Sequence, residues 1–100
     1  MSEKAIKLAK KLLESDADFL DHVTALCYIG NELHDQCWNT DYHIFALLSS
    51  ELDHLPLSHV RPQCSAEFLA KSDKEIAENI EFYRADVVSA CNKILQQQNV

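Results

Sequence analysis

Apolar residues recur every three or four positions along most of the chain, the spacing that places them on one face of an α-helix. Such a stripe runs through residues 5–13, resumes after a polar break at residues 19–33, and returns at residues 44–52. No segment shows the strict alternation of apolar and polar residues that is typical of a half-buried strand. The pattern therefore predicts a chain built of helices.

Capping residues and breakers give the expected bounds of the first three helices. Ser2 precedes the first helix, and the polar segment 15–18 offers N-caps for the second. Thr40 is the expected N-cap of the third helix, and residues 34–39 connect it to the second. Pro56 stops the third helix, because the residue before proline avoids helical dihedral angles.

The last part of the chain predicts a long loop followed by one long helix. Residues 54–63 form the longest irregular stretch, and a single helical turn is expected at residues 65–71. Residues 72–75 (Ser-Asp-Lys-Glu) match a capping box, in which side chains satisfy the first backbone N–H groups of a helix. We therefore expect the last helix to cover residues 73–97.

These elements predict an all-α protein, with a single helical domain over residues 1–100. The expected architecture is a bundle of about four main helices around one core, with a long irregular loop after the third helix. Gly30 lies on the apolar stripe of the second helix, where glycine costs about 1 kcal/mol relative to alanine. Its presence there indicates a close approach of another helix to the second helix.

The cysteines and the first residues favour a cytoplasmic protein with reduced thiols. The four cysteines have no C-x-x-C spacing, and the first 20 residues lack a compact apolar centre with a cleavage site. The longest apolar run, residues 44–48, is far shorter than the roughly 20 residues that cross a bilayer. A disulfide-bonded secreted domain is the alternative.

Charge is distributed unevenly along the chain. Residues 1–11 carry a net charge of +3 and residues 61–100 a net charge of −1, whereas residues 12–60 hold nine acidic residues and no Lys or Arg. We call residues 12–60 the cation-free block. Net negative charge repels nucleic-acid phosphates and anionic membranes, and it favours a basic protein partner. The alternative is a solvated acidic surface that only keeps the protein soluble.

Candidate chemistry is sparse, so we expect no catalytic activity, no metal and no cofactor. Glu51 and His54 form one Glu-x-x-His pair, whereas di-iron bundles need two such pairs and two further Glu. His34 and Cys37 lack the second close ligand pair of structural zinc sites. The alternative is a small metal-dependent or His-based hydrolase that uses residues 51–61, with His54 and His59 as acid and base and Arg61 holding an anion. If that loop has only a structural role, we expect Arg61 to pair with a carboxylate instead.

An aromatic and acidic group before the third helix predicts a contact surface. Trp38 and Tyr42 flank Asp41, and Asp35 lies just before them. Trp and Tyr are enriched among the residues that contribute most to protein interfaces. The alternative is that Trp38 covers the core from the connection, because Trp is generally largely buried.

Two resemblances extend this interpretation. The segment 50–56 (Ser-Glu-Leu-Asp-His-Leu-Pro), followed by Arg61, resembles the signature of a family of small, uncharacterised bacterial helical proteins. In size, acidity and helicity the chain is similar to bacterial immunity proteins, including those of contact-dependent growth inhibition. This second resemblance implies a toxin inhibitor that occludes a basic nuclease domain, since nuclease toxins carry basic surfaces for phosphate backbones.

The combined hypothesis is a cytoplasmic immunity protein that binds a basic nuclease toxin domain at 1:1 and contacts neither nucleic acid nor membrane directly. A homodimer through the helical stripes is a further alternative. The expected partner-binding residues are Asp35, Trp38, Asp41, Tyr42, Glu51, Asp53 and His54.

Overall fold

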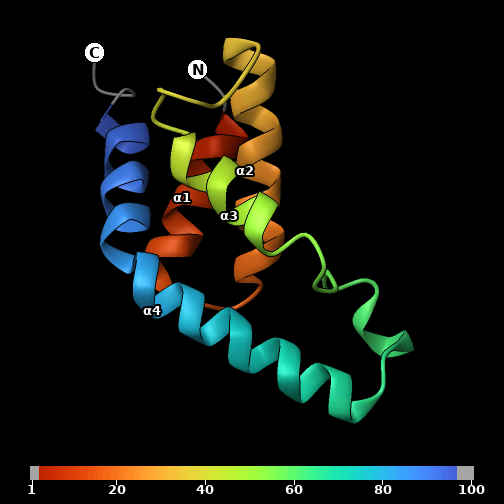
Figure 1. Ribbon diagram of the computed structural model, residues 1–100. Coiled ribbons are helices and arrows are strands. Elements are labelled where there is room, and N and C mark those ends of the chain that lie inside the picture. The colour runs from red at the N-terminus through yellow and green to blue at the C-terminus, as the bar shows by residue number, and fades with distance from the viewer. Residues whose placement is uncertain (1–2, 97–100) are drawn as a thin grey trace.

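The computed structural model describes residues 3–96, and this part of the chain is helical without any strand (Figure 1). The elements are α1 (Glu3–Glu14), α2 (Phe19–His34), α3 (His43–Glu51), a short 3-10 turn η1 (Arg61–Gln63) and α4 (Ala66–Gln96). The prediction of an all-α fold with four main helices is confirmed. None of the helices within residues 3–96 is long and apolar enough to cross a lipid bilayer.

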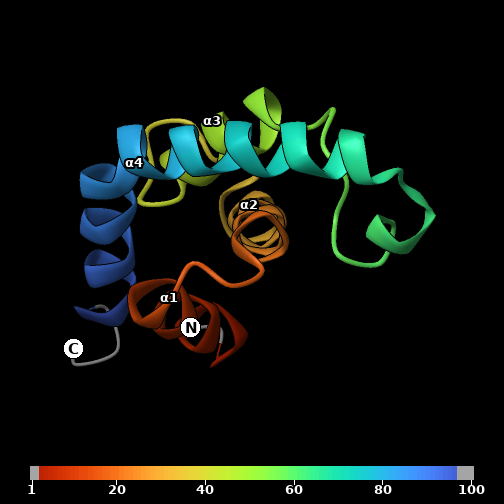
Figure 2. The same cartoon turned by 90° about the horizontal axis from the view of Figure 1, so that it is seen from below.

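The second helix lies at the centre of the arrangement. Figure 2 shows α1 and α3 on opposite sides of α2, and α2 packs against both. The long α4 passes over the α3 side and then bends, so that its last turns reach α1 (Figures 1 and 2). The first and last helices of the chain are therefore neighbours.

All four helices contribute to one apolar core. The stripes that predicted the helices supply its fully buried side chains, because each stripe faces the other helices rather than solvent. The residues with no exposed surface include Ala5, Ala9, Val23, Leu26, Phe45, Leu48, Cys91 and Ile94.

The start of α4 differs from the prediction. Residues 66–96 form one continuous helix, so the expected break and the capping box at residues 72–75 are wrong. The Ser72 side chain is 1% exposed, and its Oγ donates to the carbonyl oxygen of Phe68 at 2.8 Å, within the same helix. Ser65 is the residue that caps α4, since its Oγ accepts from the Phe68 N–H at 3.1 Å. Ser2 and Gln97, the other predicted boundary residues, lie outside the described residues.

The start of α3 is also shifted. The predicted N-cap, Thr40, accepts a hydrogen bond from the Tyr42 N–H at 3.1 Å, which closes a turn two residues before the helix. The helix itself begins at His43, with Tyr42 at the N-cap position and no side-chain cap. It ends at Glu51, well before Pro56, because Leu52 already leaves the helical path.

A close approach at Gly30 is confirmed, but the segment that approaches is the connection before α3 and not a second helix. A Cβ atom at this position would lie 2.6 Å from Tyr42 Cβ and 2.9 Å from Cys37 Sγ. Carbon atoms in contact are normally about 3.5–4.0 Å apart, so only glycine fits without displacing the connection. The glycine thus lets residues 37–42 pack directly on the backbone of α2.

The long loop between α3 and α4 is fixed by polar contacts with distant residues. Arg61 donates two hydrogen bonds to the carboxylate of Asp73, at 2.8 and 3.0 Å. The backbone N–H of Ser58 donates to Asp21 at 3.0 Å, and its hydroxyl donates to Asp18 at 2.9 Å. Arg61 therefore has the role expected if the loop is structural, and the loop projects with the first turns of α4 beyond the bundle (Figure 1).

Candidate functional site

The basic residues of α1 and the acidic residues near α3 lie on different sides of the molecule. The lysines of α1 all point outward and are exposed: Lys4, Lys7, Lys10 and Lys11. Because α1 and α3 lie on opposite sides of α2, the helix that carries these cations is on the far side from α3 (Figure 2). Lys4 also lines a hollow on α2, together with Asp21 and Glu32. The two ends of α3 carry acidic residues of the cation-free block. The fold thus places the lysines of α1 and the acids next to α3 on different sides of α2, and Lys93 of α4 lies at the hollow beside Asp41.

The predicted contact residues fall into two groups, one between the C-terminus of α2 and the start of α3, and one at the C-terminal end of α3. Asp35, Trp38 and Asp41 precede the helix, whereas Glu51 ends it and is followed by Asp53 and His54. The helix has nine residues, so about 14 Å separates its two ends, whereas Asp35 is the C-cap of α2. Both groups fit within one interface of standard size, which buries about 800 Å² on each partner.

The first group presents one aromatic and one acidic side chain to solvent. Asp35 follows α2 in the left-handed conformation (φ 62°) and is exposed. Trp38 is 46% exposed, and its ring and the His43 ring form a T-shaped pair with centroids 4.8 Å apart. The alternative, in which Trp38 covers the core and is largely buried, is therefore only partly correct, because much of the residue remains exposed. Asp41 is partly buried beside a hollow of about 340 Å³ between α3 and α4.

Tyr42 does not reach the surface, and we correct its place among the contact residues. It is 1% exposed, and its ring packs against those of His34 and Phe45, with centroids 5.8 and 6.3 Å apart. Its buried hydroxyl has no hydrogen-bond partner within the described residues. Burial, followed by the nearby charges of Asp41 and Cys37, raises the pKa of Tyr42. Its packing role follows from the space that Gly30 leaves open.

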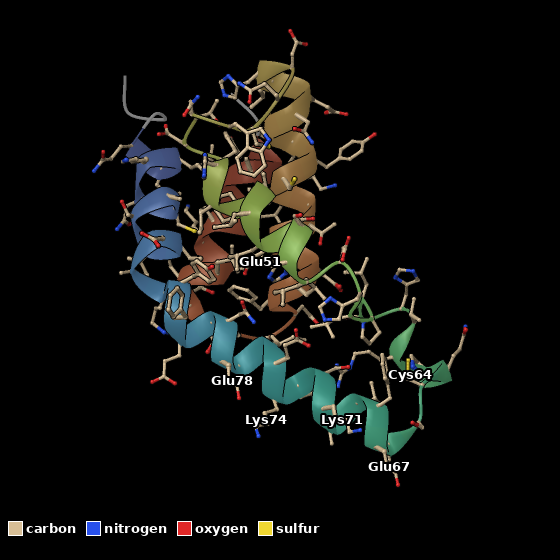
Figure 3. The ribbon with its side chains drawn as sticks, in the orientation of Figure 1. Glu51, Cys64, Glu67, Lys71, Lys74 and Glu78 are labelled. Atoms are coloured by element: carbon tan, nitrogen blue, oxygen red, sulfur yellow. The ribbon has the colours of Figure 1, made fainter. Side chains whose placement is uncertain are left out.

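The second group is tied to α4. The Tyr83 hydroxyl donates to both oxygens of Glu51 at 3.2 Å, and His54 Nε2 lies 3.0 Å from a carboxylate oxygen of Glu75. Asp53 is the most open member, with 78% of its side chain exposed. Figure 3 shows Glu51 at the end of α3, above the first half of α4.

A small acidic cleft lies where the loop crosses the start of α2. It encloses about 200 Å³, and the carboxylates of four aspartates line it: Asp16, Asp18, Asp21 and Asp73. Each of them already has a partner, because Asp16 accepts from Arg84 at 2.9 Å and the others hold the loop. The pairing with Arg61 keeps the pKa of Asp73 below its ordinary value.

Sequence reasoning did not single out this cleft. Three of its aspartates belong to the cation-free block, but their position beside Asp73 depends on the path of the loop. The available signal was the cluster of three acids within residues 16–21.

The residues of the hydrolase alternative do not share a cavity. Arg61 lines the acidic cleft, whereas His59 lines a separate hollow on the outer face of α2, and His54 is bound to Glu75. Within residues 3–96, no three His, Cys, Asp or Glu side chains are placed to share a metal ion. The geometry thus offers no assembled acid–base or metal site among these candidates.

The four cysteines are free thiols in the structure. Burial raises the pKa of Cys91 to about 11. Burial and the neighbouring Cys27 raise the pKa of Cys37 to about 11, and its Sγ donates to the Cys27 carbonyl oxygen and to Asn31 Oδ1, both at 3.2 Å. These two thiols stay protonated at neutral pH and act as packing groups.

Comparison with known protein families, with curated proteins and with solved structures finds no match to this chain.

Proposed function

We propose that the protein is a cytoplasmic inhibitor of the immunity-protein type, which binds a basic toxin domain, a nuclease, through the side of the molecule that α3 occupies. One observation carries this proposal, namely that α1, with its exposed lysines, and α3, with the exposed Glu51 and Asp53 at its C-terminal end, lie on opposite sides of α2. Complementary fields speed the encounter of such partners and fix their register.

The proposed mechanism is occlusion. Asp35 and Asp53 pair with lysine or arginine residues that would otherwise bind substrate phosphates, and Trp38 supplies an apolar anchor between them. Truncating a charge in the middle of such an interface typically costs 2–5 kcal/mol, partly because the partner's charge is left buried. The inhibitor needs no cofactor or catalytic residue for this action.

The test is co-purification at low salt, with the tagged chain as bait in its native host. Low salt matters because a charge-driven contact weakens as ionic strength rises. The informative variant is Asp35→Asn with Asp53→Asn, which removes two charges and leaves the shape of both side chains. Asparagine also tolerates the left-handed conformation of residue 35.

Glu67→Gln is the matched control, since Glu67 is an exposed acid on the outward face of α4, away from α3 (Figure 3). We expect the wild type and the Glu67→Gln variant to recover one basic domain at equal stoichiometry, and the double variant to lose it. Equal recovery by all three proteins refutes binding through the α3 side.

A further inference from the structure

The second half of α4 presents an outer face that no other described element covers. Figures 1 and 2 show this half at the edge of the molecule. Its Phe82 is 79% exposed, the highest value among the exposed large apolar residues, and Val88 is 38% exposed. A shallow hollow of about 840 Å³ follows the helix from Glu81 to Gln96. Val88 and Ala85 are the apolar residues that line this hollow, and Phe82 lies beside the ring of Tyr83. Exposed apolar side chains on an uncovered helix face are available for contact with a partner.

Opposite charges stand near the two ends of this face. Glu81 and Lys93 both line the hollow, and they are twelve residues apart, about 18 Å along the helix. Neither forms an ion pair within residues 3–96. Arg84, which lines the same hollow, is paired with Asp16, which raises its pKa, and the nearby Glu81 also raises the pKa of Arg84. The face therefore carries a carboxylate toward one end and an ammonium group toward the other.

We propose that this face binds a second copy of the chain, with the two α4 helices antiparallel. A two-fold axis level with residue 87, midway between residues 81 and 93, places Glu81 opposite Lys93 of the partner subunit, and the same contact repeats by symmetry. A parallel pair would place like charges together, so the charges select the antiparallel orientation. Ala85 and Ser89 are small and exposed on the same face, and they let the helices approach closely.

We name a second copy of the chain as the partner because Glu81 and Lys93 of one copy can pair with Lys93 and Glu81 of the other. An acidic or a basic partner would pair with only one of the two charged groups and be repelled by the other. The face is about 22 Å long and one helix wide, so the contact lies at the small end of specific interfaces. We therefore expect a dimer that dissociates on dilution. This inference does not depend on the proposed function.

The first experiment measures the mass of the purified full chain in solution. Sedimentation equilibrium from about 1 µM to about 1 mM covers the range in which small interfaces dissociate. We expect the mass to rise from 11.4 kDa toward twice that value as the concentration increases. Higher salt should shift the rise to higher concentration. A mass of 11.4 kDa throughout the range overturns the proposal.

Charge reversal then tests the geometry. Glu81→Lys places lysines opposite each other at both symmetric contacts, and Lys93→Glu does the same with glutamates. Each change should raise the dissociation constant at least about tenfold, because like charges across an interface repel. The double variant Glu81→Lys/Lys93→Glu restores both opposite pairs, as does an equimolar mixture of the two single variants. Both should therefore dimerise like the wild type.

The controls make the same charge changes elsewhere on α4. Glu67→Lys and Lys74→Glu alter exposed residues that point away from the bundle (Figure 3). We expect them to leave dimerisation unchanged, and thermal unfolding should show that all variants fold, since every changed residue is exposed. A dimer that persists in both single variants at residues 81 and 93, or that the double variant fails to restore, overturns the antiparallel arrangement.

Discussion

Replacing Gly30 by alanine reverses the usual effect of this substitution. In an open helix position, alanine is more stable than glycine by about 1 kcal/mol. At position 30 the new Cβ would lie 2.6 Å from Tyr42 Cβ and 2.7 Å from Tyr42 Cγ. Tyr42 Cβ is attached directly to the backbone, so relief requires the connection to move. Overpacking of a tight core costs about 1–3 kcal/mol, and three contacts below 3.0 Å place this change in the upper part of that range.

The net expectation is a loss of about 1–2 kcal/mol in the free energy of unfolding. Each kcal/mol lowers Tm by roughly 4–8 °C in a domain of this size. Urea unfolding followed by circular dichroism measures the change. The matched comparison is Glu32→Ala against Glu32→Gly, at an exposed position of the same helix, where alanine should be the more stable residue by about 1 kcal/mol.

The reasoning fails if alanine stabilises position 30 as it does position 32. Such a result would mean that the segment 37–42 yields to a methyl group without loss, and that the close approach to α2 contributes little to the fold.

Three further outcomes are expected. Asp73→Asn removes a carboxylate whose pKa is lowered by the paired Arg61. This pairing stabilises the native state above about pH 4 and is lost as the pH falls through the lower pKa of the folded protein. Between about pH 6 and pH 2, thermal melts should therefore show a smaller loss of stability for the variant than for the wild type. Ser65→Ala should cost about 1 kcal/mol of unfolding free energy as a lost N-cap. Ser72→Ala should cost less, because α4 is continuous there, and the reverse order would contradict that continuity. Cys37 and Cys91 should resist a thiol reagent at pH 8 until urea unfolds the protein, while the other two thiols react first; four equal rates in the native state would contradict their burial.

Periodicity located the helices well, because burial of one face is what stabilises a helix in a small domain. It failed where two signals competed. The sequence of residues 72–75 satisfies the capping-box pattern, yet Ser72 can also bond within a helix, to the carbonyl oxygen four residues earlier. A single sequence does not tell these outcomes apart, because tertiary packing decides between them. Here the Ser72 side chain is buried, and the helix continues through it.

The sequence predicted the acidic charge of the candidate site, but it did not predict which side chains come together at the surface. The cation-free block is visible in the sequence, and its acids do occupy the ends of α3. Which side chains reach solvent depends on packing, as Tyr42 and Trp38 show. They lie four residues apart in one connection, yet Tyr42 is 1% exposed and Trp38 is 46% exposed. The acidic cleft depends on a contact between Asp73 and a loop that begins far earlier, and local patterns carry no information about it.

The contact between α1 and α4 joins the beginning of the chain to its end. During synthesis, about 80 residues must follow α1 before the last turns of α4 exist to cover it. At roughly 5–20 residues per second, that interval lasts roughly 4–16 s. Within this interval α2 becomes available to pack against α1, but throughout it the part of the apolar face of α1 that α4 covers has no final partner. The core therefore closes only once translation is almost complete, and a ribosome-bound chain exposes a surface that the finished protein hides.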